Sequence, residues 1–187
     1  EPVAGEIACD HAAAAGLGAV GALLRTITVL GPAGRIERTR GDFLLYDDGF
    51  TPAVANAVDA VDAERRAVGA ALGCEPLPIA RALSRAGYGP EGDLWTTAHG
   101  SRAFSQVRAP RSLGAGWSSD VSHVLRTWAD LGEQLEVPVP GLRAVIGLAD
   151  AVTGRDSWGA GRSLDDLGVE RMSRATLLRY LDTGETE

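Results

Sequence analysis

Residues 51 to 73 read T-P-A-V-A-N-A-V-D-A-V-D-A-E-R-R-A-V-G-A-A-L-G, and this stretch decides the fold class. Thr51 is a good helix N-cap, and Pro52 suits the first helical position, where the missing N–H costs nothing. One helical face carries Val54, Val58, Val61, Val68 and Leu72, and Gly73 ends the pattern. The stretch therefore predicts a long amphipathic helix whose apolar face packs against other elements. Its charged residues predict a solvated face with local ion pairs: Asp59, Asp62, Glu64, Arg65 and Arg66.

Helical spacing recurs on both sides of this stretch, and glycine or proline separates the segments. The pattern predicts helices at 11–30, 79–86, 119–131, 142–152 and 173–183, with one helical turn near 93–98. Residues 34–49 are expected to form a loop with a short extended piece at 43–46. The sequence thus predicts an all-α fold without a nucleotide-binding sheet. Residues 1–184 form the single expected domain, and 185–187 form a tail.

Composition excludes several classes of protein. The 187 residues are 45% hydrophobic with a net charge of −7, which argues against nucleic acid or an anionic membrane as the main partner. Arg25 interrupts the longest apolar run, so no membrane span is expected. The two cysteines, Cys9 and Cys74, have no paired spacing, so neither a disulfide nor a metal site is expected and a cytoplasmic location is predicted. Abundant Ala, Gly and Arg with no Lys suggest a bacterial source.

Gly16, Gly18 and Gly21 fit the dinucleotide fingerprint G-x-G-x-x-G. That motif requires a strand before it and a βαβ unit around it. The ten residues upstream do not have the pattern of a buried strand. A helix made slim by glycine and alanine for close packing is the favoured interpretation.

The chain's best candidate for acid–base chemistry lies in residues 117–128, W-S-S-D-V-S-H-V-L-R-T-W. Ser118 or Ser119 is the expected N-cap, which puts Asp120 in the first helical turn, where backbone N–H groups lower a carboxylate's pKa. His123 follows three residues later and so shares a helical face with Asp120. The competing interpretation is that Asp120 is simply a favourable helix start.

The order of motifs resembles the C-terminal, 6-phosphogluconate-dehydrogenase-like helical domain of the octopine/nopaline (opine) dehydrogenase family. The segments that carry the resemblance are G-R-I-E (34–37), G-D-F-L-L-Y-D-D-G-F-T-P-A-V-A (41–55), A-V-D-A-E-R-R-A-V-G-A-A-L-G (60–73), V-P-V-P (137–140), G-R-S-L-D-D-L-G-V (161–169) and M-S-R-A-T-L-L-R-Y-L-D-T-G (172–184). The resemblance implies a helical substrate domain that, in the family, closes over an NAD(P)H-binding Rossmann domain. Such enzymes reductively condense an amino acid with a 2-keto acid.

The resemblance carries over to the family's catalytic residues only in part. Asp120-Val121 matches the family's Asp-Val, which implies that Asp120 corresponds to the catalytic Asp. The family's catalytic His falls near Arg25 when counted back from Gly34, and no His stands there. Ser119 replaces the family's Glu, the family's Arg for a substrate carboxylate is missing, and no Rossmann domain is present in the sequence.

Three functions follow from these observations. The first is a cofactor-independent biosynthetic enzyme, a cyclase, isomerase or dehydratase of specialised metabolism acting on a small molecule. In it Asp120 and His123 act as acid and base, Arg25 binds an anion, and Trp117, Trp95 and Tyr46 form an aromatic wall. The second is the substrate domain of an NAD(P)-dependent dehydrogenase whose Rossmann part lies upstream or in another chain. The third is a non-catalytic binding or dimerisation module.

A purely structural role stays open for each of these residues: Trp117 as part of the core, and Arg25 as a surface cation. A helical domain without its sheet partner exposes apolar surface, so a homodimer is predicted.

Overall fold

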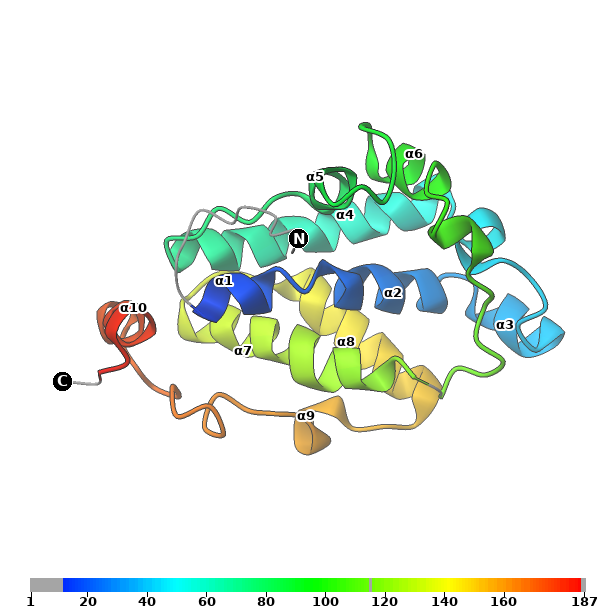
Figure 1. Ribbon diagram of the computed structural model, residues 1–187. Coiled ribbons are helices and arrows are strands. Elements are labelled where there is room, and N and C mark those ends of the chain that lie inside the picture. The colour runs from blue at the N-terminus through cyan, green and yellow to red at the C-terminus, as the bar shows by residue number, and fades with distance from the viewer. Residues whose placement is uncertain (1–11, 115, 186–187) are drawn as a thin grey trace.

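The computed structural model describes residues 12–114 and 116–185 (Figure 1). Its α-helices are α1 Ala12–Leu17, α2 Val20–Leu30, α3 Ala33–Thr39, α4 Pro52–Ala71, α5 Ile79–Arg85, α6 Leu94–His99, α7 Arg126–Gln134, α8 Pro140–Thr153, α9 Ser157–Ala160 and α10 Arg174–Thr183. Two π-helical turns, η1 Leu45–Gly49 and η3 Asp120–Leu125, and one 3₁₀ turn, η2 Phe104–Gln106, complete the secondary structure. Residues 12–114 and 116–185 contain no strand, and the prediction of an all-α fold is confirmed.

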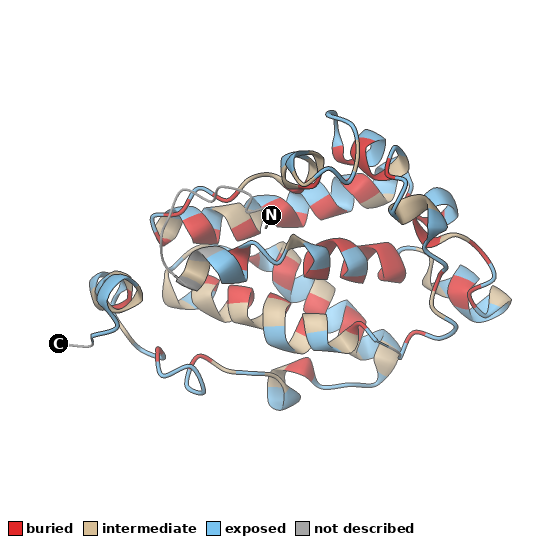
Figure 2. Ribbon diagram, in the orientation of Figure 1, coloured by how far each residue is buried: buried red, intermediate tan, exposed pale blue. Residues whose placement is uncertain are grey.

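Helix α2 lies at the centre of the bundle. It packs against α4, α8 and both π-helical turns, and Figure 1 shows it between α4 on one side and the η3–α7 segment on the other. Eight of its 11 residues are buried, and most of this helix is red in Figure 2. Arg25, on the face toward η3, is exposed and is the one charged residue of this helix.

Helix α4 forms where its sequence predicts. The Thr51 side chain accepts a hydrogen bond from the Val54 N–H at 3.4 Å, and Pro52 occupies the first position. Glu64 holds the start of α8, because its two carboxylate oxygens accept the N–H groups of Gly141 (2.7 Å) and Leu142 (2.8 Å). A carboxylate at a helix N-terminus satisfies two N–H groups that have no partner within the helix.

The predicted solvated face of α4 is wrong at Asp62 and Arg65, which are both buried. Arg65 donates from Nε to Asp62 Oδ1 (2.7 Å), from Nη1 to the Leu17 carbonyl (2.7 Å) and from Nη2 to the Leu77 carbonyl (2.6 Å). The guanidinium thus ties α1 and the segment before α5 to α4. A buried charge is tolerated because it is paired and its donors are satisfied.

Two segments differ from the sequence-based prediction. The predicted helix 11–30 breaks at Gly18 and Ala19 into α1 and α2, and its first residue lies outside the described part of the chain. The predicted loop 34–49 contains α3 and η1; Asp48 Oδ2 closes η1 by accepting the Leu44 N–H at 3.0 Å. The expected extended piece is reduced to Leu44, which forms an isolated antiparallel bridge with Arg108.

The glycine fingerprint does not form a nucleotide-binding loop. Gly16 lies in α1, Gly18 in the break and Gly21 in α2, and no strand adjoins them among the described residues. Within the same residues no single helix is long and apolar enough to cross a membrane; one pair bent by 66°, 15–30 with 33–39, meets the criteria of length and composition.

Cys74 is disulfide-bonded, so the expectation of no disulfide is wrong at this residue. Cys9 lies outside the described part of the chain. Because disulfides are rare in a reducing cytoplasm, this bond lends no support to the predicted cytoplasmic location.

Candidate functional site

An ion pair between distant segments joins Arg25 of α2 to Asp120 of η3. Arg25 Nε lies 2.8 Å from Asp120 Oδ2, and Arg25 Nη2 donates to Asp120 Oδ1 at 3.4 Å. The two residues are 95 positions apart in the sequence, and the packing of η3 along α2 brings them together. The contact engages two nitrogens of the guanidinium, whose planar fork has five N–H donors in all.

Burial is unequal within this pair. The Arg25 side chain is 50% exposed, whereas that of Asp120 is 15% exposed. Burial raises the pKa of Asp120 above its usual value, and the charge and hydrogen bond of Arg25 oppose this effect without cancelling it. The site therefore combines a solvent-accessible cation with a carboxylate that is easier to protonate than an ordinary aspartate.

The pKa shift of Asp120 is opposite to the one expected from a helix N-terminus. Ser119 has helical backbone angles and makes no capping hydrogen bond, and the Asp120 N–H already donates to the Trp117 carbonyl at 3.0 Å. Among the described residues, no backbone N–H of the first turn donates to the Asp120 carboxylate, and its partner is Arg25. Desolvation therefore outweighs any stabilisation by the helix terminus.

Tyr46 of η1 is the third member of the site. Burial raises its pKa to about 12, with a smaller lowering by Arg25 and a raising by Asp120, so its phenol lies within electrostatic reach of both charges. The ring stacks on Phe104 with centroids 4.5 Å apart, and Phe104 stacks on Tyr88 at 5.6 Å. Arg25, Asp120 and Tyr46 are called the Arg25 cluster below.

His123 does not join this cluster. It is exposed, and its Nδ1 lies 2.9 Å from the Ser122 hydroxyl. No hydrogen bond or ion pair links it to Asp120 among the residues that the structure describes. The prediction of a shared face assumed an α-helix, but η3 is a π-helix, whose i→i+5 hydrogen bonds widen the turn and move residue i+3 off the face of residue i.

Neither of the two predicted tryptophans stacks on Tyr46 among the ring contacts of residues 12–114 and 116–185. Trp117 is 2% exposed and belongs to the hydrophobic core, with no hydrogen-bond partner for its buried Nε1. Trp95 is an exposed residue of α6 whose ring contacts His99 at 4.5 Å between centroids. Phe104, which the sequence analysis missed, stacks on Tyr46 instead, and its position in a long irregular segment gave no signal of this role.

No group of three or more His, Cys, Asp or Glu side chains suited to a metal ion occurs in 12–114 or 116–185. The arrangement can still bind an anion at Arg25 and exchange a proton at Asp120.

Comparison with known proteins identifies the family of this helical domain. Residues 8–153 match the family described as NAD/NADP octopine/nopaline dehydrogenase, alpha-helical domain. The chain belongs to this family. All three residues of the Arg25 cluster lie within the segment that matches the octopine/nopaline dehydrogenase domain, whereas α9 and α10 follow it.

Curated relatives in the octopine/nopaline dehydrogenase family are longer proteins. The opine dehydrogenase of Arthrobacter sp. (strain 1C) is 28% identical over 158 residues, covering 83% of this chain and 44% of that protein. The protein ocs of Agrobacterium tumefaciens (strain Ach5) is 28% identical over 138 residues, covering 71% of this chain and 37% of that protein. Vitopine synthase of Allorhizobium ampelinum is 28% identical over 122 residues. The chain thus spans less than half the length of these relatives.

Proposed function

We propose that the chain is a helical, opine-dehydrogenase-like biosynthetic enzyme that performs acid–base chemistry on a small carboxylate without a nicotinamide cofactor of its own. The observation that carries this proposal is the ion pair of Arg25 with Asp120 at 2.8 Å. The family resemblance puts a proton-exchanging His near position 25. An arginine there keeps its charge at all relevant pH values and cannot exchange that proton.

Each member of the Arg25 cluster has a role in this proposal. Arg25 is half-exposed, so donors not used by Asp120 bind a substrate carboxylate. Asp120, whose pKa is raised by burial, removes a proton from the carbon next to a carbonyl and returns it elsewhere. Tyr46, with a pKa of about 12, stays protonated and donates to the oxygen that gains negative charge. Isomerisation, dehydration and cyclisation share this proton abstraction.

A solvent-exchange experiment tests the proposal without knowledge of the natural substrate. Pyruvate or another 2-oxo acid is incubated with the chain in deuterium oxide, and loss of the proton signal next to the carbonyl is followed by NMR. Exchange faster than in buffer is expected, and Asp120→Asn should slow it by about a hundredfold or more, the usual range for a general base.

Control variants make the result specific. Arg25→Gln should weaken binding of the 2-oxo acid, and Tyr46→Phe should slow exchange with little effect on binding. Asp130→Asn is the matched control, because Asp130 lies on the adjoining helix α7, pairs with Arg126 at 3.3 Å and also has a pKa raised by burial. Equal exchange in the Asp120 and Asp130 variants, or none above buffer with any 2-oxo acid of a broad panel, would contradict the proposal.

A second candidate is the substrate domain of an NAD(P)-dependent dehydrogenase. The family's description names NAD/NADP, and the chain covers only 44% of the opine dehydrogenase it matches. Calorimetric titration with NADH and then NADPH separates the two candidates. We expect no binding up to millimolar cofactor; saturable micromolar binding would favour the dehydrogenase, to be assayed with pairs of amino acids and 2-keto acids.

A further inference from the structure

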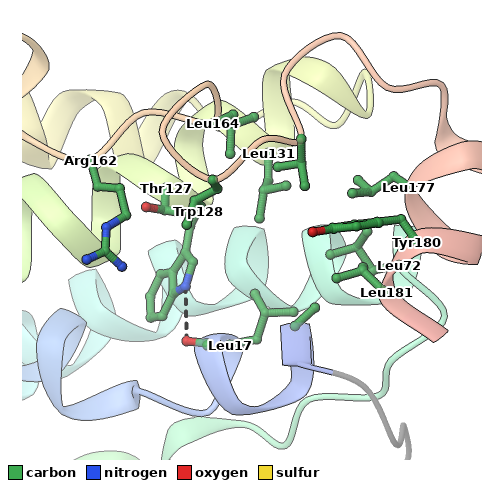
Figure 3. A pocket seen from close by; sticks show the side chains of 14 residues that line it. Leu17, Leu72, Thr127, Trp128, Leu131, Arg162, Leu164, Leu177, Tyr180 and Leu181 are labelled. Carbon is green, nitrogen blue, oxygen red and sulfur yellow. Dashed lines mark hydrogen bonds between the residues drawn. The ribbon is translucent and has the colours of Figure 1, made fainter. Parts of the chain in front are cut away.

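A cavity of about 410 Å³ lies outside the Arg25 cluster, where α10 and the segment 162–169 close over α1 and α7 (Figure 3). It is within the usual size range of small-molecule pockets. Its lining residues are Ala13, Gly16, Leu17, Leu72, Thr127, Trp128, Leu131, Arg162, Leu164, Leu167, Val169, Leu177, Tyr180 and Leu181. The outer wall, from Arg162 onward, lies beyond the segment that matches the family.

The cavity is distinct from the Arg25 cluster. No member of the cluster lines it, although η3 and α7 are continuous and connect the two places. Thr127 and Leu131 follow Asp120 by 7 and 11 residues. They therefore lie about two and three turns further along the continuous η3–α7 helix than Asp120 does.

Most of the cavity wall is apolar, and its polar backbone and side-chain atoms are largely engaged. The Trp128 indole forms one wall, and its Nε1 donates to the Gly16 carbonyl at 3.3 Å, a bond that Figure 3 marks. The Thr127 hydroxyl donates to the His123 carbonyl at 2.8 Å. A ligand therefore meets hydrocarbon over most of its surface.

Two polar side chains of the cavity have unused hydrogen-bonding groups. Arg162 is exposed at the rim beside Trp128 and makes no hydrogen bond or ion pair with any described residue. The pKa of exposed Asp166 is lowered mainly by hydrogen bonds from Ser163, and the charge of Arg162 makes only a minor contribution. The Tyr180 hydroxyl points from α10 into the cavity, as Figure 3 shows, and likewise has no partner in that part of the chain. Among the lining residues, Arg162 carries the one formal charge.

We propose that this cavity binds an amphipathic carboxylate, with the carboxylate on Arg162 and the hydrocarbon body between α7 and α10. A guanidinium recognises a carboxylate with two parallel hydrogen bonds, and the leucines provide the apolar surface for the body. One water molecule, with its single non-hydrogen atom, takes up about 30 Å³ of liquid. By the same measure, the cavity volume has room for a ligand of roughly a dozen non-hydrogen atoms. Tyr180 donates to a polar atom midway along that body or to the carboxylate itself.

Calorimetric titration of the whole chain with decanoate, below the concentration at which decanoate forms micelles, tests this assignment; decanol and decylamine are the comparison ligands. We expect decanoate to bind most tightly and decylamine least. Arg162→Gln should weaken decanoate binding by about ten- to a hundredfold, the range for hydrogen bonds to a charged group, and leave decanol unchanged. Arg111→Gln, at another exposed arginine outside the cavity, should change neither.

Leu131→Trp fills the cavity from α7 and should abolish binding of both decanoate and decanol. A cooperative unfolding transition of this variant shows that it is folded. Leu167→Trp, at an exposed lining position, serves the same purpose if the first variant unfolds. Three outcomes overturn the proposal: no binding of decanoate, binding that both cavity-filling variants leave intact, and decanoate binding that Arg162→Gln does not weaken. None of these outcomes bears on proton exchange at Asp120, so this proposal and the proposed function fail separately.

Discussion

At the scale of single residues, the Arg25 cluster is assembled from three segments that are far apart in the sequence. Arg25, Tyr46 and Asp120 each belong to a different secondary-structure element. Burial raises the pKa of both Tyr46 and Asp120. Arg25 keeps half of its side chain in solvent, while Asp120 is largely enclosed. A charged aspartate held this way is favourable for proton transfer and unfavourable for stability, a combination common at functional sites.

Removing the charge of Asp120 should therefore cost little stability. Asp120→Asn is expected to change the free energy of unfolding at neutral pH by less than about 1 kcal/mol, the range of partly exposed ion pairs, while it slows proton exchange by about a hundredfold or more. Denaturation by urea measures the first quantity. A loss of several kcal/mol would show that the pair is mainly structural.

The pH dependence of that comparison has a definite sign. Because burial raises the pKa of Asp120 in the folded state, the native chain holds this proton to higher pH than the unfolded chain does. The contribution of Asp120 to stability is therefore greatest below its unfolded-state pKa and falls as the pH rises through its folded-state pKa. Urea denaturation across this acidic range should show the wild-type chain losing stability relative to Asp120→Asn as the pH rises.

Tyr46 has a separate spectroscopic signature. With a pKa of about 12 its phenol should ionise late in an alkaline titration followed by ultraviolet absorbance. Because the unfolded phenol ionises near pH 10, Tyr46 also destabilises the fold as the pH rises from about 10 to about 12. Tyr46→Phe should remove the late absorbance change; its persistence in that variant would assign it to another group.

Sequence reasoning reached these residues but not their geometry. Asp120, Arg25 and Tyr46 were singled out by motif and chemical type, yet the partner of Asp120 was expected to be His123, three residues away. The π-helical turn η3 displaces His123, and a contact across 95 residues leaves no local pattern. Phe104 was missed for the same reason, since its segment has no regular periodicity.

At the scale of secondary-structure elements, α4 is predictable in its bounds and unpredictable in its buried charges. Its cap, its proline and its valine spacing are local signals, and the structure confirms the helix. Periodicity likewise gives α5, α8 and α10 within a few residues. Two features were not predictable: the break between α1 and α2, and the folding of residues 34–49 into α3 and η1. Both depend on tertiary packing, which overrides weak local preferences for helix or loop.

Arg65 should be the most costly charged residue of α4 to remove. Arg65→Met leaves Asp62 and the carbonyls of Leu17 and Leu77 without their main buried donor, and breaking a buried pair typically costs about 3 to 5 kcal/mol. Arg66→Met is the matched control, because Arg66 pairs with the same carboxylate at 3.3 Å from a 39% exposed position. Its cost should stay near or below about 1 kcal/mol. Similar losses in both variants, measured by urea denaturation, would contradict this ranking.

At the scale of the whole molecule, the predicted homodimer has a surface that suits it. The outward face of α8 presents Leu148, 53% exposed, and Val152, 39% exposed, next to a groove lined by apolar residues of α2 and α4. A twofold axis would bring this face against its own copy, and the same hydrophobic side chains would be buried on both sides.

Light scattering at micromolar concentration should report a dimer for the wild-type chain and a monomer for Leu148→Glu. Val107→Glu places the same charge at an exposed valine outside that groove and should leave the dimer intact. A monomeric wild-type mass would contradict the homodimer.

The central position of α2 has a consequence for synthesis on the ribosome. Its neighbour η3 ends at Leu125 and α8 begins at Pro140, about a hundred residues after α2 has been made. At roughly 5 to 20 residues per second, one side of α2, eight of whose residues are buried in the folded chain, waits on the order of 5 to 20 s for its partners. We therefore expect nascent chains that stall before η3 to expose the apolar face of α2, and the step that covers this face is the closing of a long loop rather than the formation of any single helix.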